Sequence, residues 1–330
     1  MSVKCVVTDY IEPDLDWEAA EMAKRGVDFA CHQLKFAPVE EVIAATRDAD
    51  VVVVNMVKVT PELIAGWEKC RLVIRHGVGY DNVDVAALTD AGIPLCYIPD
   101  YCVEEVAEQA IALILACARR VVGSRKVLEE SSARGQWDFA RAIPVFQMAG
   151  RTLGILGCGR IGSRVRQKLQ SFGLKFLVCD PYLGKERLAE LGIEQTVDKE
   201  TLFRESDYVT IHTPLTAETR HIVNRETLKL MKPTAYLVNT ARGPMVDHEA
   251  LAEALRENRI AGAAIDVFDK EPPDPDYPLF SLPNAILTPH LAWYSEDAAW
   301  RIREIIVLEV DRFGAGQPPR YCVNPGTLKH

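Results

Sequence analysis

The sequence predicts an α/β protein with two domains, each built on a parallel sheet. Short apolar segments alternate with helical patterns through both halves of the chain, which is typical of parallel strands joined by helices. A glycine-rich turn lies near the middle, within residues 152–162. The chain has 330 residues, which exceeds the size of one typical hydrophobic core, so we expect two cores.

The first hundred residues contain five short apolar segments separated by helical patterns. We expect strands at Val3–Thr8, Val27–Cys31, Val51–Val54, Leu72–Arg75 and Pro94–Ile98. Strands and helices that alternate in this way form a parallel sheet covered by helices. This part of the chain therefore predicts a domain of its own.

The segment after this domain changes character twice. Glu104–Arg120 is long and mostly apolar, which predicts a helix. Val121–Gly150 contains charged and small residues in a less regular pattern, and we interpret it as an arm.

The alternation resumes at Thr152 and continues to Pro289. We expect strands at Lys175–Cys179, Tyr208–His212, Ala235–Asn239, Ala261–Ile265 and Ala285–Thr288, with helices between them. Lys270–Pro278 is rich in proline and predicts a loop, and a last helix is expected from Ser295 to Phe313.

The glycine-rich turn predicts a dinucleotide site. Thr152–Gly162 reads as a strand, a turn and the start of a helix. In such a motif Gly157 permits the tight turn, Gly159 lets the backbone approach a pyrophosphate, and Gly162 lets the helix pack on the sheet. The N–H groups and the dipole at the helix N-terminus favour the phosphates.

Asp180 strengthens this hypothesis. Three spaced glycines also occur by chance in loops, but here an apolar run precedes them and a carboxylate ends the next strand. Asp180 can accept hydrogen bonds from the adenosine ribose, and its charge would repel a 2′-phosphate. The sequence therefore favours NAD over NADP.

Composition restricts the function classes. The formal net charge of −9 offers no basic footprint for nucleic acid or an anionic membrane. The nine cysteines are scattered without C-x-x-C pairs, so we expect buried thiols in a reducing compartment and no metal site. A strand pattern at the start and the lack of a long apolar run lead us to expect a cytoplasmic protein without a signal peptide or membrane span.

Three polar clusters each follow a predicted strand: Val238–Gly243, Ile265–Pro272 and Leu287–Glu296. Taken singly, their arginine, glutamate and histidine have ordinary explanations as surface or packing residues. Ligands of open α/β sheets bind at strand ends, however, and these clusters follow a nicotinamide-type site in order. Hydride transfer to a 2-oxo acid needs a cation and a proton donor, which these clusters contain.

Together these segments resemble the D-isomer-specific 2-hydroxyacid dehydrogenases. The resemblance covers nearly the whole chain, including Arg75–Asp84, which is similar to the family's substrate-carboxylate loop, and His212–Thr216, which is similar to its cofactor-contacting loop. Pro289–Glu296 and Tyr321–Pro325 are most like the C-terminal-binding-protein branch. The animal corepressors of that branch extend into a long flexible segment, whereas this chain stops at His330, so we expect a dehydrogenase.

The resemblance implies a domain map. Residues 1–100 plus 300–330 would form a discontinuous substrate-binding domain, and residues 101–299 would form an inserted NAD-binding Rossmann domain. Both would be Rossmann-like or flavodoxin-like, with the active site in the cleft between them. Residues 121–150 would be the arm through which two copies form a homodimer.

The resemblance also implies roles for side chains. Arg242 would bind the carboxylate and the carbonyl oxygen of a 2-oxo acid with its planar fork. His290 would donate the proton as an imidazolium, and Glu271 would orient the ring and favour its charged form.

Four residues are predicted to bind the substrate. The backbone of Val78 and Gly79 would hold the carboxylate. Arg75 would add a second cation, or it is a salt-bridged residue at a strand end. Trp293 would form one wall of the side-chain pocket, or it packs between the domains.

Asp266 would contact the nicotinamide side of the cofactor, or it is a cap or loop acceptor. The other cofactor contacts implied by the resemblance are Val106, Gly157, Gly159, Arg160, Ile161, Gly162, Asp180, Pro181, His212, Thr213, Pro214, Thr219, Thr240 and Ala241.

Two alternatives stay open. One is an NAD-responsive scaffold of the corepressor type, in which the same site senses the cofactor. The other is a relative that acts on formate or phosphite. The sequence does not name the substrate.

Overall fold

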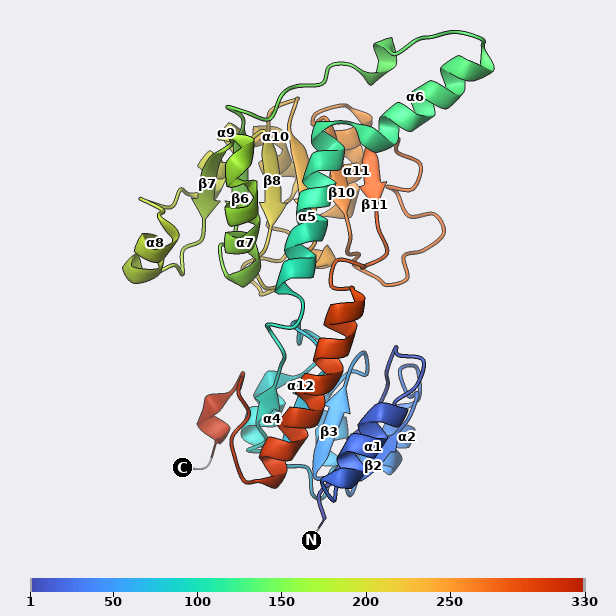
Figure 1. Ribbon diagram of the computed structural model, residues 1–330, viewed down its shortest axis with the longest axis vertical. Helices are drawn as coiled ribbons and strands as arrows, with labels where there is room; N and C mark the ends of the chain where they lie inside the picture. Colours follow the sequence, from blue (N-terminus) through green and yellow to red (C-terminus); the bar gives the residue numbers. More distant parts are fainter. Residues whose placement is uncertain (1, 329–330) are drawn as a thin grey trace. The chain divides into compact units, whose positions relative to one another are not determined.

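The computed structural model describes residues 2–328 and divides into two compact units (Figure 1). Unit 1 comprises Met1–Cys102 and Ser295–His330, and unit 2 comprises Val103–Tyr294. Each unit contains one parallel sheet. The prediction of two α/β domains with parallel sheets is therefore confirmed.

The sheet of unit 1 has five parallel strands in the order β2-β1-β3-β4-β5, which is the flavodoxin-like order. The strands are β1 (Lys4–Val7), β2 (Asp28–Cys31), β3 (Val51–Val54), β4 (Leu72–Arg75) and β5 (Leu95–Cys96). The central β3 consists of four buried valines. Such a run is expected where helices cover both faces of a parallel sheet.

Five α-helices belong to unit 1: α1 (Asp16–Lys24), α2 (Val39–Thr46), α3 (Pro61–Ala65), α4 (Val85–Asp90) and α12 (Glu296–Gly314), with a short 3-10 helix η4 (Pro325–Thr327). Side chains of Thr60, Asp84 and Ser295 accept an N–H group of the first turn of α3, α4 and α12. The predicted last helix is confirmed to within one residue at each end.

The sheet of unit 2 has six parallel strands in the order β11-β10-β9-β8-β6-β7. They are β6 (Thr152–Leu156), β7 (Lys175–Cys179), β8 (Tyr208–Ile211), β9 (Tyr236–Asn239), β10 (Gly262–Ile265) and β11 (Ala285–Leu287). The chain order reverses between β6 and β8, which creates a switch point where open α/β sheets bind ligands.

The helices of unit 2 are α5 (Val103–Ala118), α6 (Val121–Ala133), α7 (Arg160–Leu169), α8 (Lys185–Leu191), α9 (Lys199–Glu205), α10 (Arg225–Leu230) and α11 (His248–Arg256), with 3-10 helices η1 (Ala140–Ala142), η2 (Gln170–Phe172) and η3 (Gly243–Met245). α5 packs along α7. Two apolar clusters form the core, one with Phe203 and Leu251 and the other with Ile114 and Leu169. No helix in residues 2–328 combines the length and apolar character of a membrane span.

The structure corrects three expectations. The segment predicted to be irregular begins with a 13-residue helix, α6; Gly123 and its serines weaken the helical signal, but an i,i+4 ion pair between Arg125 and Glu129 supports the helix. The connection from β10 to β11 contains no helix, because five prolines interrupt it. All nine cysteines are free, but Cys31 is exposed and Cys322 is half-buried.

A buried carboxylate occupies the switch point of unit 1, between β1 and β3. Asp9 is 2% exposed and follows β1. Its Oδ1 accepts the N–H groups of Asn55 (3.2 Å) and Val57 (3.3 Å), and its Oδ2 accepts that of Met56 (2.7 Å). Asp9 therefore fixes the turn that follows β3.

Asp207 has a similar structural role in unit 2, at the edge of the sheet where the strands begin. Its carboxylate accepts the N–H of Thr152 (2.9 Å) and pairs with Arg151 (3.1 Å) and Lys232 (3.2 Å). Burial acts to raise the pKa of Asp207, but the hydrogen bonds and the two cations outweigh burial and lower it. Asp207 is thus ionised in the folded protein.

Asp207→Asn is expected to destabilise the protein at neutral pH by about 1–3 kcal/mol, because Arg151 and Lys232 lose their shared carboxylate. Since folding lowers the pKa of Asp207, its contribution is present above the pKa of the unfolded chain, about 3.9, and is lost as the pH falls through the folded pKa. Urea unfolding of both proteins should therefore show a stability gap that closes below about pH 4. A gap that does not change with pH would contradict this assignment.

Candidate active site

The loops after β6 and β8 meet at the switch point of unit 2. Gly157 has a φ of 86°, which glycine adopts without steric cost. A Cβ atom there would lie 2.5 Å from the Thr213 methyl group and 2.8 Å from the Thr213 nitrogen. Only glycine allows this contact between the two loops.

The other two glycines of the turn differ in their surroundings. Gly159 is the N-cap of α7, and a Cβ atom there would meet nothing within 4 Å. A Cβ atom on Gly162 would lie 2.1 Å from the carbonyl oxygen of Gly157. The helix thus packs closely on the turn, and open space remains beside its first residues, Arg160 and Ile161. This arrangement fits the pyrophosphate of a dinucleotide.

Asp180 ties the end of β7 to the glycine turn. Its Oδ2 accepts the N–H of Cys158 (2.9 Å), and its Oδ1 accepts the N–H of Tyr182 (3.0 Å). An ionised carboxylate has about four acceptor sites, so Asp180 retains the capacity to bind ribose hydroxyls. Pro181 follows it directly.

The loop after β8 is held by its own polar groups. The hydroxyl group of Thr219 donates to the Pro214 carbonyl (2.7 Å) and accepts the Thr216 N–H (2.7 Å). Nε2 of His212 lies 2.9 Å from the hydroxyl oxygen of Thr210. Burial lowers the pKa of His212 to about 3, so this ring is neutral and is not an acid at physiological pH.

His290 and Glu271 form the central pair of the site. Nδ1 of His290 lies 2.7 Å from Oε2 of Glu271, and Oε1 of Glu271 accepts the N–H of Phe268 at 3.0 Å. Burial acts to raise the pKa of Glu271, but the hydrogen bond to His290 and the charges of His290 and Arg242 outweigh it and lower the pKa. Glu271 is therefore an anion that holds Nδ1, which leaves Nε2 of His290 for proton exchange.

Asp266 holds the backbone of the loop that carries His290. It is fully buried. Its Oδ1 accepts the Thr288 hydroxyl group and the Leu291 N–H (3.1 Å), and its Oδ2 accepts the Ala292 N–H (2.9 Å). Its carbonyl oxygen accepts the N–H of His290 (2.7 Å). These bonds support the alternative that Asp266 is a loop acceptor; its contact with the cofactor stays a prediction.

Arg242 follows β9 on a segment that is fixed by Asn239. The Asn239 side chain donates to the Arg242 carbonyl (2.8 Å) and accepts the N–H of Ala241 (3.0 Å). A Cβ atom on Gly243 would lie 2.0 Å from the carbonyl carbon of Phe268. The segments after β9 and β10 are thus in direct contact, which brings Arg242 close enough to influence Glu271.

Sequence reasoning missed two polar residues at strand ends, Asn239 and Thr288. Both fall inside segments that it had singled out. Their signal is the position: each is a polar residue at the end of a parallel strand, where a loop begins.

The loop predicted to bind the substrate carboxylate, Arg75–Asp84 (the carboxylate loop), lies in unit 1 and begins at the end of β4. Gly77 has a φ of 143°, and a Cβ atom there would lie 2.0 Å from Nη1 of Arg75. Arg75 also donates to the carbonyl oxygen of His76. The guanidinium group is therefore folded back over the backbone of His76 and Gly77.

The remaining predicted residues lie in three separate segments of unit 2. Val106 is buried in the first turn of α5. The half-buried ring of Trp293 packs edge-on against Tyr294, with centroids 5.3 Å apart. Thr240 and Ala241 lie between Asn239 and Arg242.

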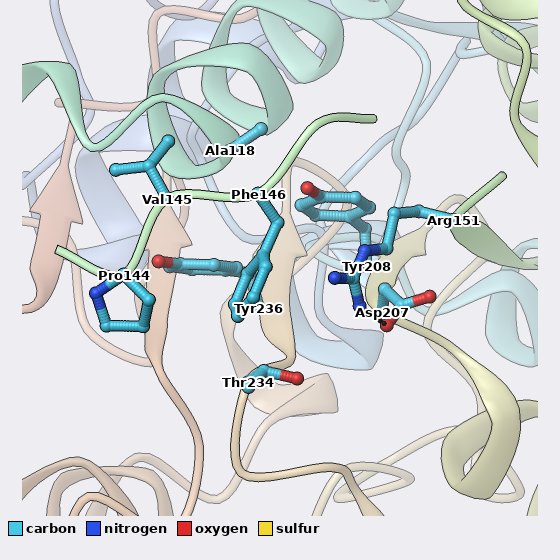
Figure 2. Close-up of a pocket in the computed structure, with 9 residues that line it drawn as sticks. All are labelled: Ala118, Pro144, Val145, Phe146, Arg151, Asp207, Tyr208, Thr234 and Tyr236. Carbon is cyan, nitrogen blue, oxygen red and sulfur yellow. Dashed lines mark hydrogen bonds and ion pairs between the residues drawn. The ribbon is translucent and has the colours of Figure 1, made fainter. Parts of the chain in front are cut away.

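A small pocket lies at the opposite edge of the unit 2 sheet, where Tyr208 and Tyr236 begin β8 and β9 (Figure 2). Phe146 and Arg151 also line it, and its cavity of about 10 Å³ holds about one water molecule. This volume excludes a substrate or a dinucleotide.

The chain matches known proteins over most of its length. A family model described as D-isomer specific 2-hydroxyacid dehydrogenase, NAD binding domain, matches residues 111–292. The chain is 39% identical, over 98% of its length, to a D-3-phosphoglycerate dehydrogenase of Methanocaldococcus jannaschii, of which it covers only 59%. It is also 39% identical, over 87% of its length, to a glyoxylate reductase of Korarchaeum cryptofilum, of which it covers 86%.

A solved structure also matches nearly the whole chain. The D-lactate dehydrogenase of Aquifex aeolicus, complexed with NAD and lactic acid, matches with a TM-score of 0.84 and 29% sequence identity. The match covers 98% of this chain and 97% of that chain.

Gly159→Ala is expected to weaken NADH binding by at least about tenfold, because the methyl group would occupy the open space beside the first turn of α7. Its effect on the free energy of unfolding should be about 1 kcal/mol or less, since the methyl group meets no protein atom within 4 Å. Titration of NADH fluorescence and thermal unfolding measure the two effects.

Gly184→Ala is the matched control. Gly184 is also an N-cap glycine, of α8, and a Cβ atom there also meets nothing within 4 Å. If the two variants bind NADH with equal affinity, the pyrophosphate does not bind beside Gly159.

Proposed function

The chain belongs to the D-isomer specific 2-hydroxyacid dehydrogenase family, and on this premise we propose that it reduces a 2-oxo acid to the D-2-hydroxy acid with NADH. The observation that carries the proposal is the 2.7 Å contact between His290 and the ionised Glu271, with Arg242 nearby. These three residues supply a proton, a partner for the imidazolium and a cation for a carboxylate.

The residues of the switch point fit a dinucleotide. The pyrophosphate would lie at the first turn of α7, beside Gly159, Arg160 and Ile161, and Asp180 would accept from the adenosine ribose. NADH, when bound, supplies the hydride. Since the charge of Asp180 opposes a 2′-phosphate, NADH is preferred over NADPH. The remaining contacts proposed for the cofactor are Val106, Pro181, His212, Thr213, Pro214, Thr219, Thr240, Ala241 and Asp266.

The charge that develops on the substrate determines what the side chains do. When C2 of a 2-oxo acid gains hydride, its oxygen becomes an alkoxide unless a proton arrives. Arg242 binds the carboxylate and the carbonyl oxygen and stabilises this charge. Nε2 of His290 gives its proton to the oxygen, and Glu271 stabilises the imidazolium that is present before the transfer. In alcohol oxidation His290 accepts the proton instead.

Unit 1 contributes to recognition of the substrate carboxylate. The N–H groups of Val78 and Gly79 are donors in a loop whose shape is set by Gly77. Arg75, whose guanidinium group lies over His76 and Gly77, adds a positive charge to this loop. We assign these groups to the carboxylate that every 2-oxo acid carries.

The test is NADH oxidation with a panel of 2-oxo acids, from glyoxylate and hydroxypyruvate to branched and aromatic compounds, repeated with NADPH. Turnover of at least one compound, faster with NADH, is expected. A protein that binds NADH but reduces none of them would favour the scaffold of the corepressor type. Turnover of formate or phosphite with NAD would favour the second alternative.

The placement within the family rests on two segments. Pro289–Glu296 and Tyr321–Pro325 favour the C-terminal-binding-protein branch, whereas the relatives described above are named glyoxylate reductase and phosphoglycerate dehydrogenase. In either branch, catalytic activity is favoured by the presence of Arg242, Glu271 and His290.

The arm supports a homodimer. Figure 1 shows α6 and the segment after it projecting from the rest of unit 2. Seven large apolar side chains are exposed there: Val121, Val122, Leu128, Trp137, Phe139, Ile143 and Phe146. An exposed apolar set of this size is typical of an interface between proteins.

Light scattering of the wild type should therefore give the mass of two chains. A double variant with Trp137→Asp and Phe139→Asp should give the mass of one chain. A monomeric wild type would contradict the proposal.

His290→Gln is expected to lower kcat by about 10²- to 10⁴-fold and to leave NADH binding largely intact, as for loss of a positioned proton donor. Glu271→Gln should move the pH profile of reduction to lower pH, because an imidazolium without its carboxylate partner gives up its proton more easily. Steady-state kinetics across the pH range measure both effects. A near-normal rate for His290→Gln would assign the proton to another group, and an unmoved profile would make Glu271 structural.

Trp293→Ala is expected to reduce kcat/KM for medium-sized apolar 2-oxo acids far more than for glyoxylate. An indole wall would contribute roughly 0.8 kcal/mol for each methylene group that it buries. The ratio of kcat/KM between a branched 2-oxo acid and glyoxylate is the measurement, and glyoxylate is its internal control. A uniform loss across the panel would assign Trp293 to packing.

A further inference from the structure

A second histidine–glutamate pair lies in unit 1, outside the groups used above. Nε2 of His76 lies 3.0 Å from Oε1 of Glu12, and the two side chains are only 9% and 8% exposed. Burial acts to raise the pKa of Glu12, but the hydrogen bond from His76 and its charge outweigh burial, so that the pKa is lowered to about 2. Glu12 is therefore a carboxylate that accepts a hydrogen bond from His76, and loss of His76 would leave this buried anion without that donor.

The pair links two separate strand ends of the unit 1 sheet. Glu12 lies in the loop after β1, and His76 follows β4 directly. β3 lies between these two strands in the sheet. The backbone N–H of His76 donates to the carbonyl of Val54 at the end of β3 (2.8 Å), and the carbonyl of Gly77 accepts the N–H of Ile98 (3.0 Å). The carboxylate loop is thus fixed by backbone bonds on one side and by the imidazole on the other.

Glu12 also lies within electrostatic range of Arg303. The charge of Glu12 acts on Arg303 of α12, whose guanidinium group forms two bonds to Glu18, at 2.5 and 2.6 Å. The rings of Trp17 and Trp300 also lie near Arg303, with their centroids 5.9 and 5.3 Å from its guanidinium carbon. These contacts hold the positive charge of Arg303 within electrostatic range of Glu12.

We propose that Glu12 and His76 are positioning residues for substrate affinity: their buried hydrogen-bonded pair fixes the backbone of residues 76–79, whose N–H groups at Val78 and Gly79 bind the substrate carboxylate. The inference rests on the proposed function of that loop. Neither side chain exchanges a proton or touches hydride chemistry. Their loss therefore acts on the affinity for the 2-oxo acid and not on the chemical step.

The experiment compares Glu12→Gln, His76→Gln and the double variant with the wild type. Each single variant is expected to raise KM for the preferred 2-oxo acid by about tenfold, the effect of losing a hydrogen bond to a charged group. The kcat and the dissociation constant of NADH should stay within about twofold of wild type, as expected when the substrate and the transition state lose the same binding energy. The double variant should resemble the single variants, because the two residues act as one unit.

Arg71→Gln is the matched control. Arg71 precedes the same strand, β4, at its other end and forms an ion pair with Asp50 at 2.8 Å. Its loss should leave KM unchanged. A second readout is the binding of oxamate, an unreactive 2-oxo acid analogue, to the enzyme–NADH complex, which the pair variants should weaken in proportion to their KM.

The outcomes separate the two proposals. If the wild type is active, two results overturn the positioning role alone. One is that both single variants have the KM of the wild type. The other is that the changes in KM of the single variants add up in the double variant. An equal rise of KM in Arg71→Gln also overturns it, because any lost side-chain pair would then have the same effect. A wild type that neither reduces a 2-oxo acid nor binds oxamate overturns the proposed function, and the positioning role with it.

Discussion

The candidate site of unit 2 depends on one constraint: all six strands are parallel, so the loops that follow them meet at one edge of the sheet. Two backbone contacts make this edge compact. Gly157 lies against Thr213, and Gly243 lies against Phe268, in both places too close for a Cβ atom. Backbone contacts therefore set the distance between the glycine turn and the loop after β8, and between the Arg242 segment and the segment that leads to Glu271.

Buried carboxylates provide the second level of order. An ionised group inside a protein is stable only when donors or cations surround it, so each one orients the groups around it. Asp266 accepts three donors from residues 288–292, and Glu271 accepts the Phe268 N–H as well as His290. His290 has a φ of 54°, which is uncommon for a residue with a Cβ atom. Its main chain is fixed by Asp266 and its ring by Glu271, and this double restraint stabilises the conformation.

The sequence predicted the architecture because local patterns carry that information. The five strands of unit 1 coincide with apolar runs, and the glycine spacing identified the switch-point turn. α6 escaped prediction because it buries almost no side chain within the chain and contains Gly123 and several serines, so its sequence lacks the usual apolar periodicity of a packed helix. The role of Asp266 could not be chosen from its position, since a strand-end carboxylate can face a ligand or a loop equally well. The Glu12–His76 pair joins residues that are far apart in the chain, and no periodicity or motif connects them.

Because of Asp9, the switch points of the two sheets differ in the backbone N–H groups that they leave for a ligand. Both units have a switch point where successive backbone N–H groups can surround an anion. In unit 2 that place adjoins open space beside Gly159. In unit 1 the protein supplies the anion itself, since the carboxylate of Asp9 already accepts the N–H groups of Asn55, Met56 and Val57. A phosphate approaching there would meet a negative charge and no spare donors among those three groups. The switch point of unit 1 is thus already filled by a side chain of the protein, whereas the switch point of unit 2 adjoins open space.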